Sequence, residues 1–312
     1  MRANRIREVV RLVTTALLSI AVAWSLILQT QTTFTTHAAS REPVRARHGI
    51  VASTNEIASK VGVDILRRGG NAVDAAIAVA FALAVTHPAA GNLGGGGFMM
   101  IRLKDGRTTA IDYREMAPAA ATHNIYLDQN GKVREGDGGS VEGYRAAGVP
   151  GTVRGMELAL KRYGSHRLTW TQLIEPARVL AANGFTVNYP LARSLRGSRE
   201  YLSKYAETKR IYLNDGRFYN EGDLFRQPDL AATFARLQQR GPGEFYEGQT
   251  ARLIVDDLKR HNGLLTMADM HGYVAKERET LRGNYRGYEI VSMPPPSSGG
   301  AVLIEMLNIL EG

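Results

Sequence analysis

One arginine, Arg114, lies between two carboxylates in the segment Asp112-Tyr-Arg-Glu-Met-Ala-Pro118. A guanidinium is planar and can donate two parallel hydrogen bonds to a carboxylate, so such a residue can hold an acidic ligand in a fixed orientation. Asp112 and Glu115 are placed to orient that guanidinium. The alternative is an ordinary solvated side chain at the end of a strand. From the residues alone, both interpretations remain open.

A run of four glycines, Gly94–Gly97, is the second candidate. Its backbone N–H groups could bind an anion, as phosphate loops do. However, the run lacks the Lys-Ser/Thr ending of a P-loop and leads into a strand, whereas a P-loop leads into a helix. We therefore predict a tight crossing of two backbone segments, where any side chain would clash, and no nucleotide site.

Ser297 and Ser298 stand between three prolines and two glycines, just ahead of an apolar helical segment. A serine nucleophile there would need a partner base, yet the sequence is not G-x-S-x-G and no Asp-then-His order follows it. We predict instead that Ser298 caps the helix that begins at residue 301.

The composition excludes several other kinds of site and partner. The 312 residues are 44% hydrophobic and 22% charged, which is the balance of a folded globular protein. The absence of cysteine excludes disulfides, a thiol nucleophile and thiolate metal sites. Seven histidines show no ligand spacing, so we expect neither a metal nor another cofactor. The net charge of +9 is spread without a basic run, so we expect no nucleic-acid partner.

Helices and hairpins alternate along the body of the chain. Hydrophobic periodicity and capping residues predict one helix from Asn55 to a stop at Gly69 and Gly70, and others over residues 72–85, 152–163, 170–182, 228–240, 249–260 and 301–310. A strand pair over residues 99–113 turns at Lys104-Asp105-Gly106. We expect further hairpins at Asn130-Gly131, at Asn214-Asp215-Gly216, and over residues 278–293 with a break at Gly283-Asn284. This order predicts a layered α/β fold with antiparallel pairing.

Residues 1–40 are predicted to direct export. Arginines precede an uncharged apolar run over residues 12–28, and small residues follow up to Ala38 and Ala39. This is typical of a secretory signal peptide, although the run has nearly the length of a membrane anchor. In either case we expect the rest of the protein outside the cytoplasm, as a periplasmic or secreted protein or one anchored through residues 12–28.

Several ordered motifs together resemble the γ-glutamyltranspeptidases, also called glutathione hydrolases. The resemblance runs from about Gly49 to Glu311, and we interpret residues 41–312 as most of the large-subunit region of that family. The motifs that carry it are residues 61–66 (VGVDIL), 69–76 (GGNAVDAA), 86–88 (THP), 91–99 (GNLGGGGFM), 112–118 (DYREMAP), 148–152 (GVPGT), 241–246 (GPGEFY) and 292–300 (SMPPPSSGG).

The resemblance implies an N-terminal-nucleophile hydrolase with an αββα sandwich, made as a precursor that cleaves itself into a large and a small subunit. A threonine at the start of the small subunit would attack the γ-amide carbonyl of glutathione or another γ-glutamyl amide. Water, an amino acid or a peptide would then accept the γ-glutamyl group. In this family the arginine of the D-[FY]-R-E-M-A-P motif holds the α-carboxylate of that group, and the matching residue here is Arg114.

The chain departs from the family pattern after residues 294–300. The cleavage point, the threonine nucleophile and the oxyanion glycines that the resemblance implies have no counterpart in residues 1–312. We therefore expect no catalytic residue in this chain, an incomplete sandwich, a missing small subunit as its partner, and no activity of this chain alone.

Two other functions remain as alternatives. The related glutaryl-cephalosporin acylases also bind an acyl chain that carries a carboxylate. A non-catalytic fragment of the cell envelope could use Arg114 to bind glutamyl compounds without turning them over.

Overall fold

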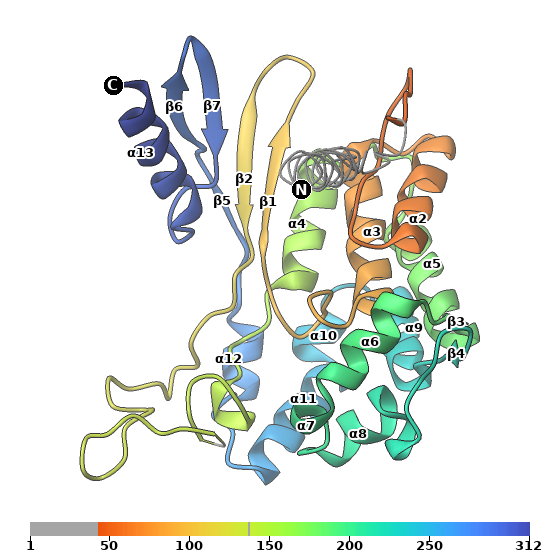
Figure 1. The fold of residues 1–312 in the computed structure, drawn as a ribbon, viewed down its shortest axis with the longest axis vertical. Helices are drawn as coiled ribbons and strands as arrows, with labels where there is room; N and C mark the ends of the chain where they lie inside the picture. The colour runs from red at the N-terminus through yellow and green to blue at the C-terminus, as the bar shows by residue number, and fades with distance from the viewer. Residues whose placement is uncertain (1–42, 137) are drawn as a thin grey trace, which may run out of the picture. The chain divides into compact units, whose positions relative to one another are not determined.

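The computed structural model describes residues 43–136 and 138–312 (Figure 1). The chain divides into two units, Met1–His48 and Gly49–Gly312. Of the first unit, residues 43–48 are described and are exposed. The export signal predicted over residues 1–40 lies outside the described residues. Among those that are described, no helix combines the length and hydropathy needed to cross a membrane.

Two capped helices open the larger unit. In α2 (Glu56–Arg67) the side chain of Asn55 accepts hydrogen bonds from the backbone of Ile57 and Ala58. In α3 (Ala72–Thr86) Asn71 and Asp74 form a reciprocal capping box. Gly69 between them has a φ of 87°, a left-handed conformation that glycine adopts without strain. Both predicted helices are confirmed.

Helix α3 is the centre of the hydrophobic core, and most of its residues are buried. It packs against α2, α4 (Thr152–Tyr163) and α5 (Trp170–Asn183), and α5 packs in turn against α9 (Pro228–Arg240). The ring of Phe81 meets Trp170 and Phe234 edge to face, with centroids 5.4 and 6.0 Å away. An almost wholly apolar helix can only be stable when neighbours cover it on most sides, as they do here.

Shorter elements complete this helical region. They are α6 (Tyr189–Gly197), α7 (Arg199–Leu202), α8 (Ala206–Tyr212), α10 (Glu244–Glu247), α11 (Gln249–Arg260), α12 (Met267–His271), the 3₁₀ turns η1 (Tyr144–Ala146) and η2 (Asn214–Gly216), and a two-stranded pair of β3 (Phe185–Thr186) and β4 (Leu224–Phe225).

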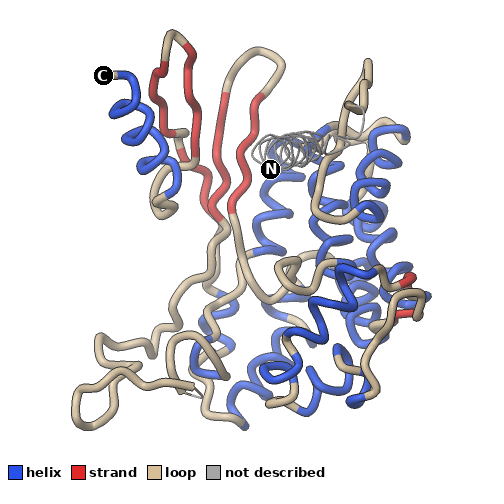
Figure 2. The backbone as a smooth tube through the Cα atoms, in the orientation of Figure 1, coloured by secondary structure: helices blue, strands red, loops and turns tan. Residues whose placement is uncertain are grey.

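A three-stranded antiparallel sheet lies beside the helices, with strand order β1-β2-β5 (Figure 2). The predicted hairpin is confirmed as β1 (Phe98–Arg102) and β2 (Thr108–Asp112), and β5 (Lys276–Arg278) joins the other edge of β2. In this register Asp112 is paired with Phe98 on one side and with Lys276 on the other. Segments far apart in the sequence therefore meet where β2 ends.

The last elements form a small assembly of their own. A hairpin of β6 (Leu281–Tyr285) and β7 (Tyr288–Ser292) packs against α13 (Gly299–Glu311), as the blue end of the ribbon shows (Figure 1). Gly283 lies under this helix, and an added Cβ there would come within 2.8 Å of the Ile304 side chain.

The predicted break of this hairpin at Gly283-Asn284 is wrong. The turn lies at Arg286-Gly287, where φ is 48° and 80°, and Tyr285 pairs with Tyr288. Two consecutive residues with positive φ are what a two-residue turn of type I′ requires. Gly283 lies within β6 and allows α13 to pack closely on the strand, so this glycine does not mark the turn.

The two other predicted hairpins do not form sheets. Around Asn130-Gly131 the chain makes a turn closed by one isolated bridge between Leu127 and Val133. Residues Asn214–Gly216 form η2, which follows α8 directly. The side chain of Leu213 is buried, and its carbonyl accepts hydrogen bonds from the backbone of Gly216 and Phe218. The positive φ angles of residues 214–216 therefore belong to the end of α8 and not to a hairpin turn.

Candidate substrate-binding site

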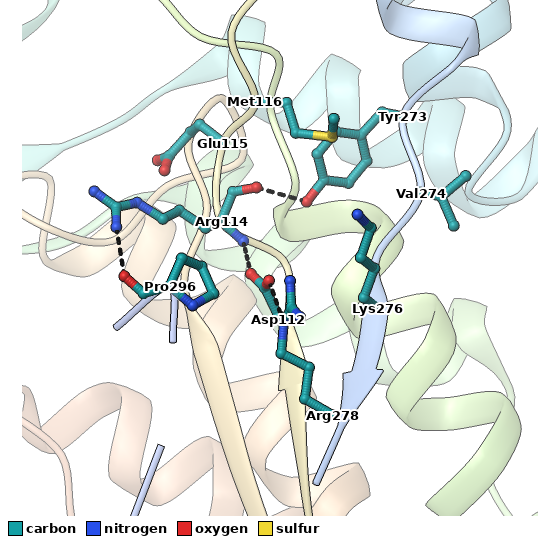
Figure 3. Close-up of a pocket in the computed structure, with 9 residues that line it drawn as sticks. All are labelled: Asp112, Arg114, Glu115, Met116, Tyr273, Val274, Lys276, Arg278 and Pro296. Carbon is teal, nitrogen blue, oxygen red and sulfur yellow. Dashed lines mark hydrogen bonds and ion pairs between the residues drawn. The ribbon is translucent and has the colours of Figure 1, made fainter. Parts of the chain in front are cut away.

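A cavity of about 310 Å³ opens where β2 and β5 approach the loop before α13. Figure 3 shows the side chains that line it: Asp112, Arg114, Glu115, Met116, Tyr273, Val274, Lys276, Arg278 and Pro296. Three cationic and two anionic side chains share this small volume. Such a concentration of charge in a concave site is suited to an ionic ligand.

Arg114 lies two residues after the end of β2, and its side chain is exposed in this cavity. Its Nη1 donates a hydrogen bond of 3.2 Å to the carbonyl of Pro296 (Figure 3). That carbonyl is a neutral acceptor, so it orients the guanidinium without neutralising its charge. The predicted binding residue therefore lines a cavity and retains the charge that would attract a carboxylate.

Asp112 holds the backbone at this point. One carboxylate oxygen accepts a hydrogen bond of 3.1 Å from the Arg114 backbone N–H, and the other accepts one of 2.8 Å from Nε of Arg278. The prediction that Asp112 orients the Arg114 guanidinium is therefore wrong. One oxygen faces the main chain and the other faces β5, where Arg278, the register partner of Ala110, reaches it diagonally.

Tyr273 fixes Arg114 from the other side. Its hydroxyl donates a hydrogen bond of 2.8 Å to the Arg114 carbonyl, and its ring stacks on Tyr246 with centroids 5.9 Å apart. Burial raises the pKa of both phenols, so each stays protonated at neutral pH. Tyr273 was not among the predicted site residues, since it is separated from Arg114 by 159 positions and carries no local signal.

The glycine run packs against the residue before Arg114. An added Cβ at Gly96 would lie 2.4 Å from the carbonyl of Tyr113, and one at Gly97 would lie 3.0 Å from its ring. A Cβ at Gly95 would meet the side chain of Asn92 at 2.8 Å, whereas Gly94 faces open space. The predicted tight crossing is confirmed at Gly96 and Gly97, where the run meets the chain that carries Arg114.

Ser298 does not cap α13 as predicted. Ser298 occupies the N-cap position with helical dihedral angles, φ −74° and ψ −22°, and its side chain accepts no capping hydrogen bond. A side-chain cap normally needs an extended backbone at this residue. Ser297 accepts instead from the backbone of Gly299, at 3.4 Å.

No metal-binding cluster is found in the part of the chain that the structure describes, where acidic and histidine side chains never form a group of three suited to an ion. The charged groups of the cavity are arginine, lysine and two carboxylates. Arginine and lysine are donors of hydrogen bonds and ligands for anions, so the cations of this cavity are suited to an acidic molecule.

The model of the γ-glutamyltranspeptidase family matches residues 58–312 of this sequence. The chain belongs to that family. It is 49% identical to the glutathione hydrolase proenzyme of Escherichia coli K12 over 271 residues, which are 86% of this chain and 46% of that protein. It thus spans about half the length of the curated relatives it matches.

Solved structures agree with this assignment. The crystal structure of Helicobacter pylori γ-glutamyltranspeptidase superposes with a TM-score of 0.83 at 47% identity, covering 86% of this chain and 76% of that one. The predicted α/β fold of the N-terminal-nucleophile hydrolases is confirmed. An acylase proenzyme from Pseudomonas sp. strain V22 is more distant. It is 38% identical over 276 residues, which are 87% of this chain and 49% of the acylase.

Proposed function

We propose that this chain supplies the glutamyl-binding part of a γ-glutamyltransferase and glutathione hydrolase, with Arg114 holding the α-carboxylate of the γ-glutamyl group. The observation that carries the proposal is the Arg114 guanidinium, which lines a cavity while its own backbone is held on both sides. Two charge-assisted hydrogen bonds to one carboxylate would fix both the position and the direction of the substrate.

The proposed reaction breaks the γ-amide C–N bond of the donor. A threonine hydroxyl adds to the carbonyl and forms an ester with the γ-glutamyl group, and the amine leaves after gaining the proton of that hydroxyl. Water then cleaves the ester to give glutamate, or the amine of an amino acid or peptide takes the group in a new amide. The role of this chain is to place the γ-carbonyl at a set distance from the bound α-carboxylate.

We also propose that the attacking threonine belongs to a partner polypeptide, because no threonine of this chain matches the nucleophile of the family. The relatives named as proenzymes support an origin by precursor cleavage. The exposed apolar face of α13 supports such a partner, since apolar patches of this kind mark interaction surfaces. Its members and their exposed fractions are Val302 (48%), Leu303 (44%), Met306 (55%), Ile309 (72%) and Leu310 (63%).

Export belongs to the same proposal. Residues 1–40 would act as a signal peptide or a membrane anchor, and residues 41–312 would form the large-subunit region outside the cytoplasm. γ-Glutamyl amides, acceptor amino acids or peptides, and water would be the small-molecule partners. No cofactor enters the proposed chemistry, because acyl transfer to a hydroxyl needs only a base and stabilisation of the oxyanion.

Kinetics of the complete gene product on γ-glutamyl-p-nitroanilide and on glutaryl-p-nitroanilide test this proposal. We expect turnover of the first to exceed that of the second, because glutaryl keeps the carboxylate that Arg114 would bind but lacks the α-ammonium group of glutamyl. Preference for the glutaryl compound would favour the acylase function. The 312-residue chain alone should turn over neither compound. If the complete product is also inactive while glutamate binds in calorimetry, the non-catalytic binding function would be correct.

A further inference from the structure

We propose that Lys276 binds a second carboxylate of the substrate, which makes the cavity selective for γ-glutamyl donors whose leaving amine itself carries a carboxylate. This inference rests on the proposed function, in which Arg114 takes the α-carboxylate. It assigns Lys276 as a residue that determines specificity, and it names the chemical class of the leaving group.

The sheet brings Lys276 to the cavity. Lys276 is the first residue of β5 and pairs in register with Asp112, the last residue of β2. Side chains of a directly opposed pair lie on the same face of a sheet, so Lys276 points to the side on which Asp112 lies. Figure 3 shows its ammonium group beside the ring of Tyr273, in the cavity that Arg114 also lines.

The ammonium group of Lys276 has no charged partner among the described residues. Asp112 is the nearest acidic residue in the register, but its two oxygens are occupied by the Arg114 backbone and by Arg278. Within the described residues, Lys276 makes neither an ion pair nor a side-chain hydrogen bond, and it is exposed. An exposed ammonium beside a carboxylate that is already paired is available to a ligand.

The charges of the cavity match a ligand with two carboxylates and one ammonium group. Three cations and two carboxylates line the cavity, and the pairing of Arg278 with Asp112 removes one of each. Arg114, Lys276 and Glu115 remain, with a net charge of +1. A γ-glutamyl amino acid or γ-glutamyl peptide has an α-carboxylate, a second carboxylate on its leaving amine and one α-ammonium group, which is the complementary set.

A pair of donors that differ in one group tests this inference in the complete gene product. γ-Glutamylglycine has the second carboxylate, and γ-glutamylglycinamide replaces it with a neutral amide. We expect the wild type to show a higher kcat/KM for γ-glutamylglycine. Lys276→Met should lower that value by about twofold to fivefold through KM, with little change for the amide, since an exposed charge pair contributes modestly to binding.

Two further variants complete the experiment. Lys276→Arg keeps the charge and should keep the preference, whereas Lys104→Met removes an exposed lysine in the β1–β2 turn and should leave both donors unchanged. An equal effect of Lys276→Met on both donors, or no effect on either, would overturn the inference while leaving the proposed function standing. Failure of the wild type to cleave both donors would instead overturn the proposed function, and this inference with it.

Discussion

The hydroxyl of Tyr273 donates a hydrogen bond to the backbone carbonyl of Arg114 over 2.8 Å, and thereby ties the segment after α12 to the end of β2. The Tyr273 side chain is almost fully buried against Tyr246. Because the contact uses the main chain of Arg114, it sets the starting point of the side chain and leaves the guanidinium available to a ligand. The exposed Arg114 is thus positioned by a buried side chain.

Replacing Arg114 by lysine should impair binding of the glutamyl group. Lysine keeps the charge but loses the two-pronged geometry, so we expect a loss of about 2–4 kcal/mol of transition-state binding, or about thirtyfold to a thousandfold in kcat/KM. Steady-state kinetics of the complete gene product would measure this. Arg252→Lys, on the exposed face of α11, is the matched control and should change stability by less than about 0.5 kcal/mol. Equal kcat/KM values for the two variants would show that Arg114 is an ordinary solvated side chain without a role in substrate binding.

Tyr273→Phe should remove the hydrogen bond that positions Arg114 without leaving a cavity in the core. The ring and its stacking on Tyr246 remain, but the Arg114 carbonyl loses its donor, which costs about 0.5–1.5 kcal/mol of unfolding free energy. Denaturant unfolding would measure that cost, and kinetics should show a higher KM with a smaller change in kcat. Tyr201→Phe, at an exposed tyrosine, is the control. A loss of stability without any change in KM would mean that the hydrogen bond does not position Arg114.

Gly155→Ala should destabilise the fold although alanine favours helices. Gly155 lies within α4, and an added Cβ would come within 2.2 Å of the Tyr113 ring, so we expect a cost of about 1–3 kcal/mol from overpacking. Gly197→Ala in α6, where nothing lies within 4 Å, should stabilise by up to about 1 kcal/mol. Thermal unfolding of both variants measures the difference. The same sign for both would contradict the close packing of α4 on Tyr113.

Acid stability should depend on Glu175. Hydrogen bonds from Arg178, and a further one from Gln238, lower the pKa of Glu175 from 4.5 to about 2. A carboxyl with a lowered pKa in the folded state stabilises the protein above its unfolded pKa, and that contribution is lost as the pH falls from about 4.5 toward 2. Urea unfolding at several pH values should therefore show a smaller acid loss in Glu175→Gln than in the wild type.

Arg178→Met removes the other partner and should reduce the same acid-dependent loss, since it returns the Glu175 pKa toward its ordinary value. Both effects should be small, because 44% of the Glu175 side chain is exposed and water screens the pair. Unchanged pH profiles in both variants would show that this ion pair does not contribute to folding.

Local signals were reliable where one segment alone decides the structure. The cap at Asn71, the Asp-Gly turn before β2 and the boundaries of α4 and α9 follow from neighbouring residues, and each was predicted. The turn of the β6–β7 hairpin was misplaced because Gly283 serves contact with Ile304 in α13. Local sequence does not show whether a glycine marks a turn or a close contact.

The amino-acid sequence by itself determined the family, the α/β class, the main helices and the choice of Arg114, because motifs and periodicity are properties of contiguous residues. The tertiary structure alone decided which groups surround Arg114. It brought Tyr273, Lys276 and Pro296 to Arg114, and it turned Asp112 toward Arg278 and away from the guanidinium. The physical reason is that a charge acts on whatever lies within a few ångströms, and in a folded chain those neighbours come from distant positions.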